Sequence, residues 1–396
     1  MTLLRVRPGR ALLWLLVAAA AVTAAVRYAW GLGAVTNLSD RFPWGLWIGF
    51  DLMSGIALAA GGFTIAAAVH VFKLHRYHGL LRPAVLTGFL GYLLAITALL
   101  VDLGRPWNIW HPFVMWNPRS VMFEVAWCVI LYSGVLALEF GQVVLQRLRQ
   151  WTLLRLTRLA LPPLVIAGVL LSTLHQSSLG SLFLIVPGKL HPLWYTPLLP
   201  VLFFVSAVAV GLGMVTVEAT LAERTFRHRF NVHLFTDLGR AAVVVLSLYL
   251  GLKIIDLTVR GVWPLLLSTT MESVLFMVEV GLGVILPLVL LATPAVRSRR
   301  GLGAASWLIV SGVVLNRINV AVTGMVRSSQ ATYVPAAGEF LITAGIVAAG
   351  LLAYTYAVQY LPVFEHESSA PVPEEGPAIR PQPDGSPRGE ALLSGR

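Results

Sequence analysis

Titratable side chains gather in one short stretch, VDLGRPWNIWHP, which occupies residues 101–112. It holds Asp102, Arg105 and His111 beside two tryptophans, and a long apolar run lies on either side of it. An acid, a cation and an imidazole next to aromatic rings can exchange protons with a planar, apolar substrate. Anchoring at the membrane interface would explain the two tryptophans, but it would not explain the charged residues beside them.

Two carboxylates, Glu124 and Glu139, lie in the apolar run that follows. On one helix they would be about 22 Å apart in height and about 60° apart in direction. Such a pair near opposite ends of one helix face is what a proton route through the membrane needs. Tyr92, in the preceding apolar run, falls at an intermediate depth and is a candidate for the same route. The alternative is that each carboxylate only pairs with a nearby arginine or a helix end.

The polar residues near Glu124, at one end of this route, are predicted to form one cluster. Its members are Asp102, Arg105, His111 and Glu124, with Asp51, His175 and Gln176 as candidate additions. A titratable group in an aromatic cleft that opens to lipid suits a quinone, because the headgroup needs hydrogen-bond partners and its reduction takes up protons. We therefore predict that this cluster binds a quinone.

Composition indicates that these residues belong to a membrane protein. Of 396 residues, 57% are hydrophobic and 12% are charged, whereas soluble proteins average about 25% charged residues. The apolar residues form runs long enough to cross a bilayer as helices. The predicted fold class is all-α, a polytopic integral membrane protein of about ten transmembrane helices in helix bundles. The predicted spans are 11–30, 46–72, 81–101, 121–145, 159–176, 197–222, 238–258, 271–292, 304–325 and 337–360.

The charge pattern predicts the orientation of these spans. Seventeen lysines and arginines lie in the N-terminus and in the loops on its side, against seven in the opposite loops. By the positive-inside rule both termini are expected to be cytoplasmic, with residues 101–112 on the other side. The net charge of +11 therefore reflects membrane topology and indicates no nucleic-acid partner.

Two domains are expected: a transmembrane domain over 1–362 and a disordered cytoplasmic tail over 363–396, which is rich in proline, glycine and charge. Within the first, 46–145 and 197–292 could each form a four-helix group with their neighbours. The run GIALAAGGF at 55–63 has the small residues that tight helix packing needs.

Further charges lie within the predicted spans of the second half. Arg317, in the stretch NRIN, must find a partner in the membrane interior. We expect a structural ion pair with Glu272, Glu279 or Glu339.

Cysteine and histidine usage restricts the cofactors. The single Cys128 excludes an internal disulfide and a cysteine-ligated iron–sulfur cluster. A haem held by two histidines needs them to face each other. Only His70 and His175 lie close to helical stretches, and they fall near opposite faces of the bilayer. We expect no haem and no metal bound by this chain.

Four stretches together resemble the polysulfide reductase NrfD family of integral membrane subunits. They are FPWGLWIGFDLMSGIALAAGGF, DLGRPWNIWHP, FEVAWCVILYSGVLALEF and NRINV. The resemblance covers about residues 10–362, and within the family the length and the ten spans are closest to the Ni/Fe hydrogenase branch.

This resemblance implies a haem-free, quinone-reactive subunit of the cytoplasmic (inner) membrane. Its partners would be an extracytoplasmic iron–sulfur (ferredoxin-like) subunit and a catalytic subunit, a Ni/Fe hydrogenase in this branch, in a membrane lipid environment. Electrons would pass to menaquinone or ubiquinone, and related complexes also move protons. A molybdopterin-type or polysulfide reductase partner remains open, and so does a secondary transporter.

The resemblance also implies residue roles, which agree with those predicted above for most positions. Glu124, Asp102 and His175 would act in catalysis. Glu139 and Tyr92 would belong to the proton pathway, which Arg82 joins through the resemblance alone.

Overall fold

The computed structural model describes residues 8–364 except 187, 227–229 and 332. Within this part of the chain, ten helices or series of helices are long and apolar enough to cross a membrane. The predicted all-α fold with ten spans is therefore confirmed. The helices are α1 (Pro8–Trp30), η2 (Trp47–Ser54), α2 (Gly55–Leu58), α3 (Ala60–Ala66), η3 (Ala67–Val71), α4 (His78–Asp102), α6 (Val121–Arg147), α7 (Trp151–Ser181), α8 (Leu199–Phe226), α9 (Val232–Val259), α11 (Met271–Val280), η6 (Gly281–Ile285), α12 (Leu286–Ala292), α13 (Arg299–Ile318), η8 (Asn319–Thr323), α14 (Gly324–Ser329) and α15 (Ala337–Tyr360).

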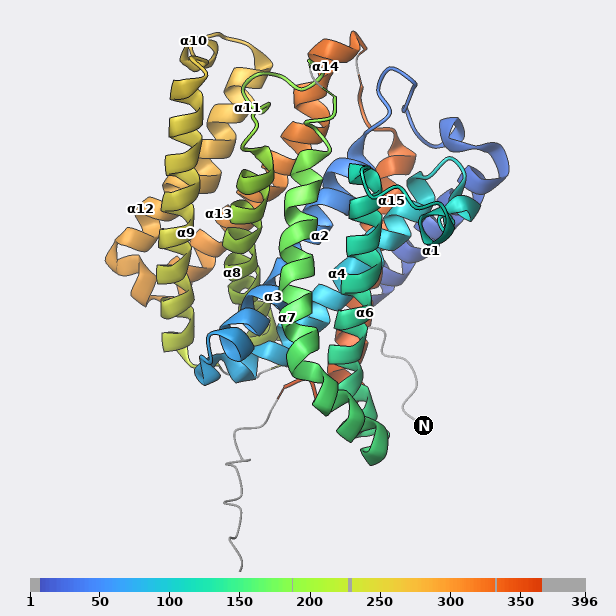
Figure 1. Ribbon diagram of the computed structural model, residues 1–396, viewed down its shortest axis with the longest axis vertical. Coiled ribbons are helices and arrows are strands. Elements are labelled where there is room, and N and C mark those ends of the chain that lie inside the picture. Colours follow the sequence, from blue (N-terminus) through green and yellow to red (C-terminus); the bar gives the residue numbers. More distant parts are fainter. Residues whose placement is uncertain (1–7, 187, 227–229, 332, 365–396) are drawn as a thin grey trace, which may run out of the picture. The chain divides into compact units, whose positions relative to one another are not determined.

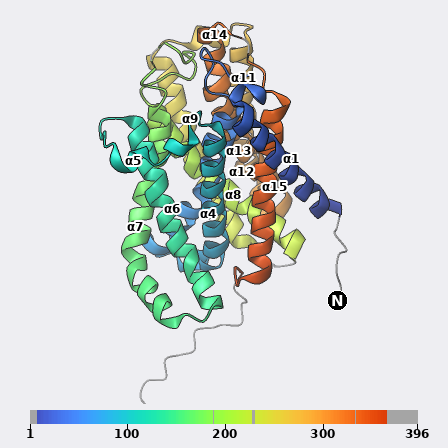
Figure 2. The ribbon, with the colours of Figure 1, turned by 90° about the vertical axis from the view of Figure 1, so that its right-hand side faces the viewer.

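Eight of the spans form two four-helix bundles (Figures 1 and 2). In the first bundle the η2–η3 series, α4, α6 and α7 pack in a ring. In the second bundle α8, α9, the α11–α12 series and α13 do the same, and α8 also packs against α3 and α7. The remaining helices, α1 and α15, pair with each other, and α15 packs on α4. The two expected four-helix groups are thus present.

The short helices mark the two ends of the bundles. Helices α5 (His111–Val114), α10 (Trp263–Leu266) and α14 lie toward the same end (Figures 1 and 2). We call this end the outer face, following the charge pattern, and the opposite end the inner face. Helices α4 and α9 run from the inner to the outer face, and α6 runs back to the inner face, since consecutive spans cross the membrane in opposite directions.

Glycines let helices touch at two crossings. Gly62 of α3 lies against Gly88 and Ala84 of α4, where an added Cβ would come 3.1 Å from the Ala84 carbonyl oxygen. In the second bundle Gly283 and Gly312 face each other so closely that neither position has room for a Cβ. The expectation that residues 55–63 serve tight packing is confirmed, since without Cβ atoms the backbones themselves make contact.

The predicted tail begins slightly too early. Val363 is buried, and the ring of Phe364 packs against Phe226 and Phe230. These two residues belong to the helical unit, which extends to Phe364. The rest of the predicted tail, 365–396, lies outside the described residues.

Candidate functional site

A tyrosine and a histidine meet in the interior of the first bundle. The Tyr92 hydroxyl on α4 lies 2.7 Å from Nδ1 of His175 on α7. Tyr132 of α6 packs edge-on against Tyr92, with ring centroids 4.8 Å apart. All three side chains are buried, and Nε2 of His175 has no hydrogen-bond partner among the described residues. An imidazole bonded through one nitrogen, with the other available, can receive a proton on one side and release it on the other.

Toward the outer face this pair continues to Glu124. Ser178, one helical turn beyond His175 on α7, donates a hydrogen bond from its hydroxyl to Oε1 of Glu124. Glu124 lies in the first turn of α6, where the partial positive charge of the helix N-terminus favours a carboxylate. The side chain is exposed in the isolated chain. It is therefore the outermost member of this group and accessible to a partner molecule.

Toward the inner face the first bundle contains a polar cavity of about 350 Å³. Its polar lining residues are His70, His78, Arg82, Glu139, Gln142, Gln146 and Arg158. Buried atoms of three of them, His70 Nε2, Glu139 Oε1 and Gln142 Nε2, have no partner among the described residues. A water molecule takes about 30 Å³ of liquid volume, so the cavity has room for several. Water would satisfy the unpaired polar atoms.

The cavity brings two predicted proton-pathway residues together. Glu139 and Arg82 both line it, although Arg82 entered the prediction by resemblance alone. A second arginine, Arg158 of α7, lines the cavity together with Arg82.

Tyr132 lies between the two carboxylates of α6. It lies eight residues after Glu124 and seven before Glu139, which matches the intermediate depth expected for its neighbour Tyr92. Ser172 is buried and interacts with both tyrosines, but its hydroxyl has no partner with good hydrogen-bond geometry among the described residues. We call this series the polar path. Its members are Glu124, Ser178, His175, Tyr92, Tyr132, Ser172 and Glu139.

Asp102 lies in a different environment from Glu124. It interacts electrostatically with Arg27 of α1 and Glu339 of α15. Arg27 is buried and holds the end of α4, since its Nε donates to the Val101 carbonyl at 2.7 Å and a second nitrogen donates to the Leu103 carbonyl. The structure thus separates two members of the predicted cluster, since Asp102 lies beside α1 and α15 and Glu124 lies beside α7.

Helix geometry explains this division. Asp102 follows Tyr92 by ten residues, which turns its side chain about 80° away from that of Tyr92. Asp51 of η2 lies on the same side as Asp102 and interacts with it, while Thr343 of α15 donates to its carboxylate at 2.6 Å. Gln176 remains in the first bundle, where its amide donates to the Ile56 carbonyl.

Arg105 and His111 lie on a hairpin, residues 103–120, at the outer face. Arg105 is exposed, and His111 packs edge-on against Trp110. Trp107 and Trp116 are 67% and 64% exposed. The hairpin is fixed to α6 by ring contacts and by a hydrogen bond from the Trp127 indole to the Pro112 carbonyl. Exposed apolar patches of this kind mark contact with lipid or with another protein.

Sequence reasoning missed a second cavity, of about 470 Å³, at the outer face. It lies between the segment before η2, the connection after α7 and the end of α14. Its lining residues are Asp40, Arg41, Phe42, Pro43, Trp44, Val186, Lys189, Met325, Ser328, Ser329 and Gln330. The available signal was the stretch FPWGLWIGF, which carried part of the family resemblance. Sequence reasoning also missed the role of Arg27. Its position inside a predicted span was the available signal, because an arginine there requires partners.

The second bundle is organised around Glu279. One carboxylate oxygen accepts from Lys253 at 2.7 Å and from Asn316 at 2.8 Å. The other accepts from Trp194 at 2.9 Å and from Asn319 at 3.0 Å. All five residues are buried. A carboxylate accepts about four hydrogen bonds, so Glu279 is saturated by protein donors.

Arg317 has other partners than we predicted. It donates to Asn316 at 2.6 Å and to Ser206 at 2.9 Å, and its guanidinium lies over the Phe203 ring. The expected direct ion pair with a carboxylate is therefore wrong within the described residues, and Asn316 connects Arg317 to Glu279 instead. The amide can do so because its oxygen accepts from the arginine while its nitrogen donates to the carboxylate.

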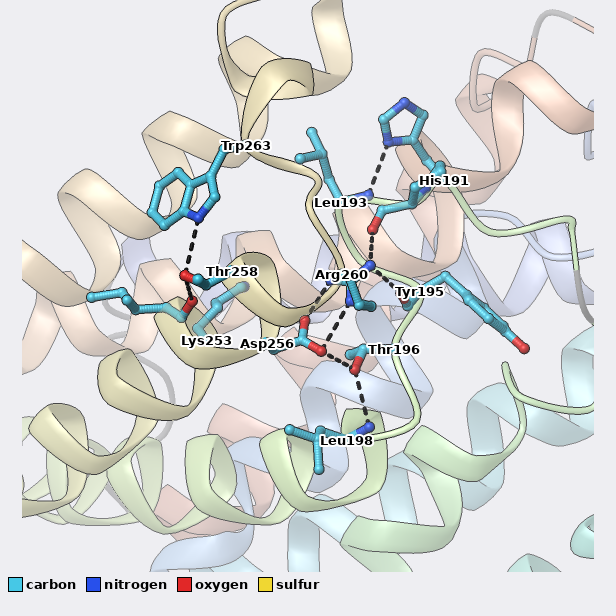
Figure 3. Close-up of polar contacts among 12 residues, drawn as sticks. His191, Leu193, Tyr195, Thr196, Leu198, Lys253, Asp256, Thr258, Arg260 and Trp263 are labelled. Atoms are coloured by element: carbon cyan, nitrogen blue, oxygen red, sulfur yellow. Dashed lines mark hydrogen bonds and ion pairs between the residues drawn. The ribbon is translucent and has the colours of Figure 1, made fainter.

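A second polar group fixes the outer end of the second bundle (Figure 3). Arg260 forms an ion pair with Asp256 of α9 and donates to the Tyr195 carbonyl at 2.7 Å. Thr196 also donates to Asp256. These bonds attach the connection between α7 and α8 to the end of α9.

Comparison with known proteins agrees with this architecture. The family model described as polysulphide reductase NrfD matches residues 34–328. A protein of Nitratidesulfovibrio vulgaris is 40% identical over 375 residues, covering 91% of this chain and 95% of that protein. The probable Ni/Fe-hydrogenase 2 b-type cytochrome subunit of Escherichia coli is 34% identical, covering 85% and 87%. The integral membrane subunit of menaquinone reductase from N. vulgaris is 29% identical, covering 85% and 87%.

Proposed function

Since this chain belongs to the polysulphide reductase NrfD family, we propose that it is the quinone-reactive membrane subunit of a redox complex. It accepts electrons from an extracytoplasmic iron–sulfur partner and passes them to a membrane quinone. The name of the E. coli relative favours a Ni/Fe hydrogenase as the catalytic partner. The name of the N. vulgaris relative favours menaquinone as the acceptor.

One observation carries the proposal. Of the eight buried side-chain atoms without a hydrogen-bond partner among the described residues, seven lie on helices of the first bundle. Buried polar groups are normally paired, so unpaired ones concentrated in one place indicate that water or a ligand completes them. They extend from His175 and Gln176 to the inner cavity at Glu139, as a proton route serving a quinone at the outer end requires.

The residues then divide the work by depth. Glu124 exchanges a proton with the quinone headgroup, because it is the accessible acid at the outer end. His175 and Tyr92 transfer protons along their hydrogen bond. Glu139 and Arg82 exchange protons with water in the inner cavity. Asp102, which interacts electrostatically with Arg27, acts from the side of α1 and α15. Arg105 and His111 lie on the hairpin to which the iron–sulfur partner docks.

This chain is proposed to hold no haem. His175 has one ring nitrogen bonded to Tyr92 within the first bundle. His70 lies in η3, at the inner end. Two axial ligands must face each other across one iron, whereas His175 lies at mid-depth beside Tyr92 and His70 lies at the inner end. A dithionite-reduced spectrum of the purified protein should lack a stoichiometric b-type Soret band.

The experiment is Glu124→Gln in the assembled complex, with turnover of a soluble quinone analogue as the readout. The amide keeps the shape and loses the proton, so turnover should fall by about 100-fold or more while the complex stays assembled. Lys189→Gln, in the outer 470 Å³ cavity, is the matched control and should keep the parental rate. A parental rate in Glu124→Gln together with a slow rate in Lys189→Gln would instead place the headgroup in that cavity. A parental rate in both variants would contradict the proposal, and solute transport without redox activity would favour a transporter.

A further inference from the structure

A small cavity of about 130 Å³ lies at the inner face, where α8 ends and α13 begins. It is separate from the polar path, which lies in the first bundle. Its lining residues are Thr216, Thr220, Glu223, Arg224, Phe235, Arg299, Arg300 and Leu302. Three arginines and one carboxylate from two helices therefore face one cavity large enough for a phosphate group but too small for a nucleoside with its phosphate.

The arginines that line the cavity carry more positive charge than its one carboxylate can neutralise. Arg299 forms an ion pair with Glu223 and donates to the Phe230 carbonyl at 3.0 Å, so this arginine is fixed and the carboxylate is neutralised. Arg224 and Arg300 have no hydrogen bond or ion pair with any described residue. Two guanidinium groups therefore remain available to an anion.

The backbone adds to this positive potential. Helix α13 begins at Arg299, and its first turn contains no acidic residue. The free N–H groups and the dipole of a helix N-terminus favour an anion. Arginine binds phosphate oxygens in pairs through its planar guanidinium group, which makes it well suited to the remaining two positions.

The position of the cavity identifies the source of the phosphate. Arg224 lies in the last turn of α8 and Arg300 in the first turn of α13, both of which are membrane spans, so the cavity lies where lipid headgroups are found. Phe235 and Leu302 form apolar walls, and Leu221 beside Thr220 is 42% exposed. A lipid can therefore place its phosphate between the arginines while its chains pass the exposed Leu221.

We propose that this cavity binds the phosphate group of an anionic membrane phospholipid. Basic pockets between helices at the cytoplasmic face are the usual sites for such headgroups. The bound lipid would fill the space between the ends of α8 and α13 and thereby stabilise the second bundle at its inner end.

The test uses the full chain, purified and placed in nanodiscs of phosphatidylcholine with one-tenth phosphatidylglycerol or cardiolipin. Lipid retained after exchange into detergent is counted by native mass spectrometry. The variants are Arg224→Gln, Arg300→Gln and the pair together. The matched control is Arg149→Gln with Arg155→Gln, two exposed arginines at the same face and outside the cavity. The thermal midpoint of each variant shows that it is folded.

We expect one retained anionic phospholipid in the wild type and the control. Each single variant should bind it about tenfold more weakly, since each loses a charge-assisted hydrogen bond. Equal retention in the double variant would overturn the proposal, and so would retention of phosphatidylcholine in place of the anionic lipid. Inorganic phosphate is added as a competitor. Displacement of the lipid at millimolar phosphate, with binding of phosphate alone, would assign the site to a soluble anion and also contradict a lipid site.

Discussion

The two bundles share an architecture but treat their buried polar groups in opposite ways. In the second bundle Glu279 is surrounded by four donors, and Lys253 is neutralised at 2.7 Å. In the first bundle Glu139 faces a cavity, and one of its oxygens and one nitrogen of His175 have no hydrogen-bond partner among the residues that the structure describes. A saturated network resists a change of proton number because every hydrogen bond would have to be rearranged. An unsaturated network can gain or lose protons through water.

This difference separates two uses of intramembrane charge. The network of the second bundle joins α9, α11 and α13 and the connection after α7, so it fixes their relative positions. The polar path of the first bundle has fewer hydrogen bonds between its members and leaves room for proton exchange. Charge inside a membrane is therefore a sign of function only when its bonding is incomplete, and otherwise it is a structural connection.

The largest expected effect tests the structural role of the second bundle. Glu279→Leu leaves Lys253 buried without a counter-charge, which should lower the free energy of unfolding by about 3–5 kcal/mol. Pairing it with Lys253→Met should recover much of that loss. Glu139→Gln in the first bundle breaks no hydrogen bond to a described residue and should cost less than about 1 kcal/mol. Denaturant unfolding in detergent measures all three, and equal losses in the two bundles would end the comparison.

The next effect concerns coupling in the first bundle. Glu139 lies about 22 Å from Glu124 along α6, too far to touch the same headgroup. Glu139→Gln should therefore impair the link between quinone chemistry and the membrane potential while quinone KM stays unchanged. Proteoliposomes assayed with and without an uncoupler give both quantities. A large rise in KM with coupling intact would place Glu139 at the quinone site instead.

A matched pair of tyrosines gives a smaller and sharper test. Tyr92→Phe removes the hydroxyl that is bonded to His175, so quinone turnover should fall by about tenfold with KM unchanged. Tyr249→Phe removes a hydroxyl that accepts from Lys253 at 3.2 Å in the second bundle. It should cost about 1 kcal/mol of stability and leave turnover alone. If both variants slow turnover equally, the second bundle also carries protons.

The smallest effect is a pH dependence at the outer face. Burial lowers the pKa of His191, Glu272 partly opposes this, and Arg327 adds to it. Its Nδ1 accepts from the Leu193 amide at 3.3 Å, which requires an unprotonated nitrogen. Neutral His191 therefore stabilises the folded segment. This stabilisation is complete above about pH 6.5, the ordinary pKa of histidine, and is lost as the pH falls below it. The protection factors of the amides in residues 190–198, which correct for the slower intrinsic exchange at low pH, should fall as the pH is lowered from 7.5 to 5.5, and His191→Gln should abolish this fall.

The spans could be predicted because long apolar runs have few alternatives in a membrane, but their ends could not. The run 159–176 was predicted, whereas α7 extends over Trp151–Ser181. Arg155 and Arg158 interrupted the apolar pattern at the inner end although the helix continues through them. Long cationic side chains reach the headgroup layer from within a helix, so hydropathy marks the apolar layer and not the helix end.

The site could be predicted in part for a related reason. The vertical spacing of Glu124, Tyr92 and Glu139 follows from the rise of a helix, and the structure has them at corresponding depths. The direction of Asp102 and the proximity of Ser178 to Glu124 depend on how helices rotate against each other. That rotation is set by packing between residues far apart in sequence, which no local pattern records. Lys253 and Glu279 were both visible as buried charges, but their pairing was not.

The pairing of α1 with α15 has a consequence for the time course of synthesis. At about 5–20 residues per second, roughly 15–60 seconds separate the emergence of these two helices. During that interval α1 stands in the membrane without the helix that covers it, and Arg27 meets its carbonyl partners only when the end of α4 has been made. The first helix to be inserted is therefore among the last to complete its packing contacts. Chains stopped before residue 337 should leave α1 open to proteolysis and to cellular quality control.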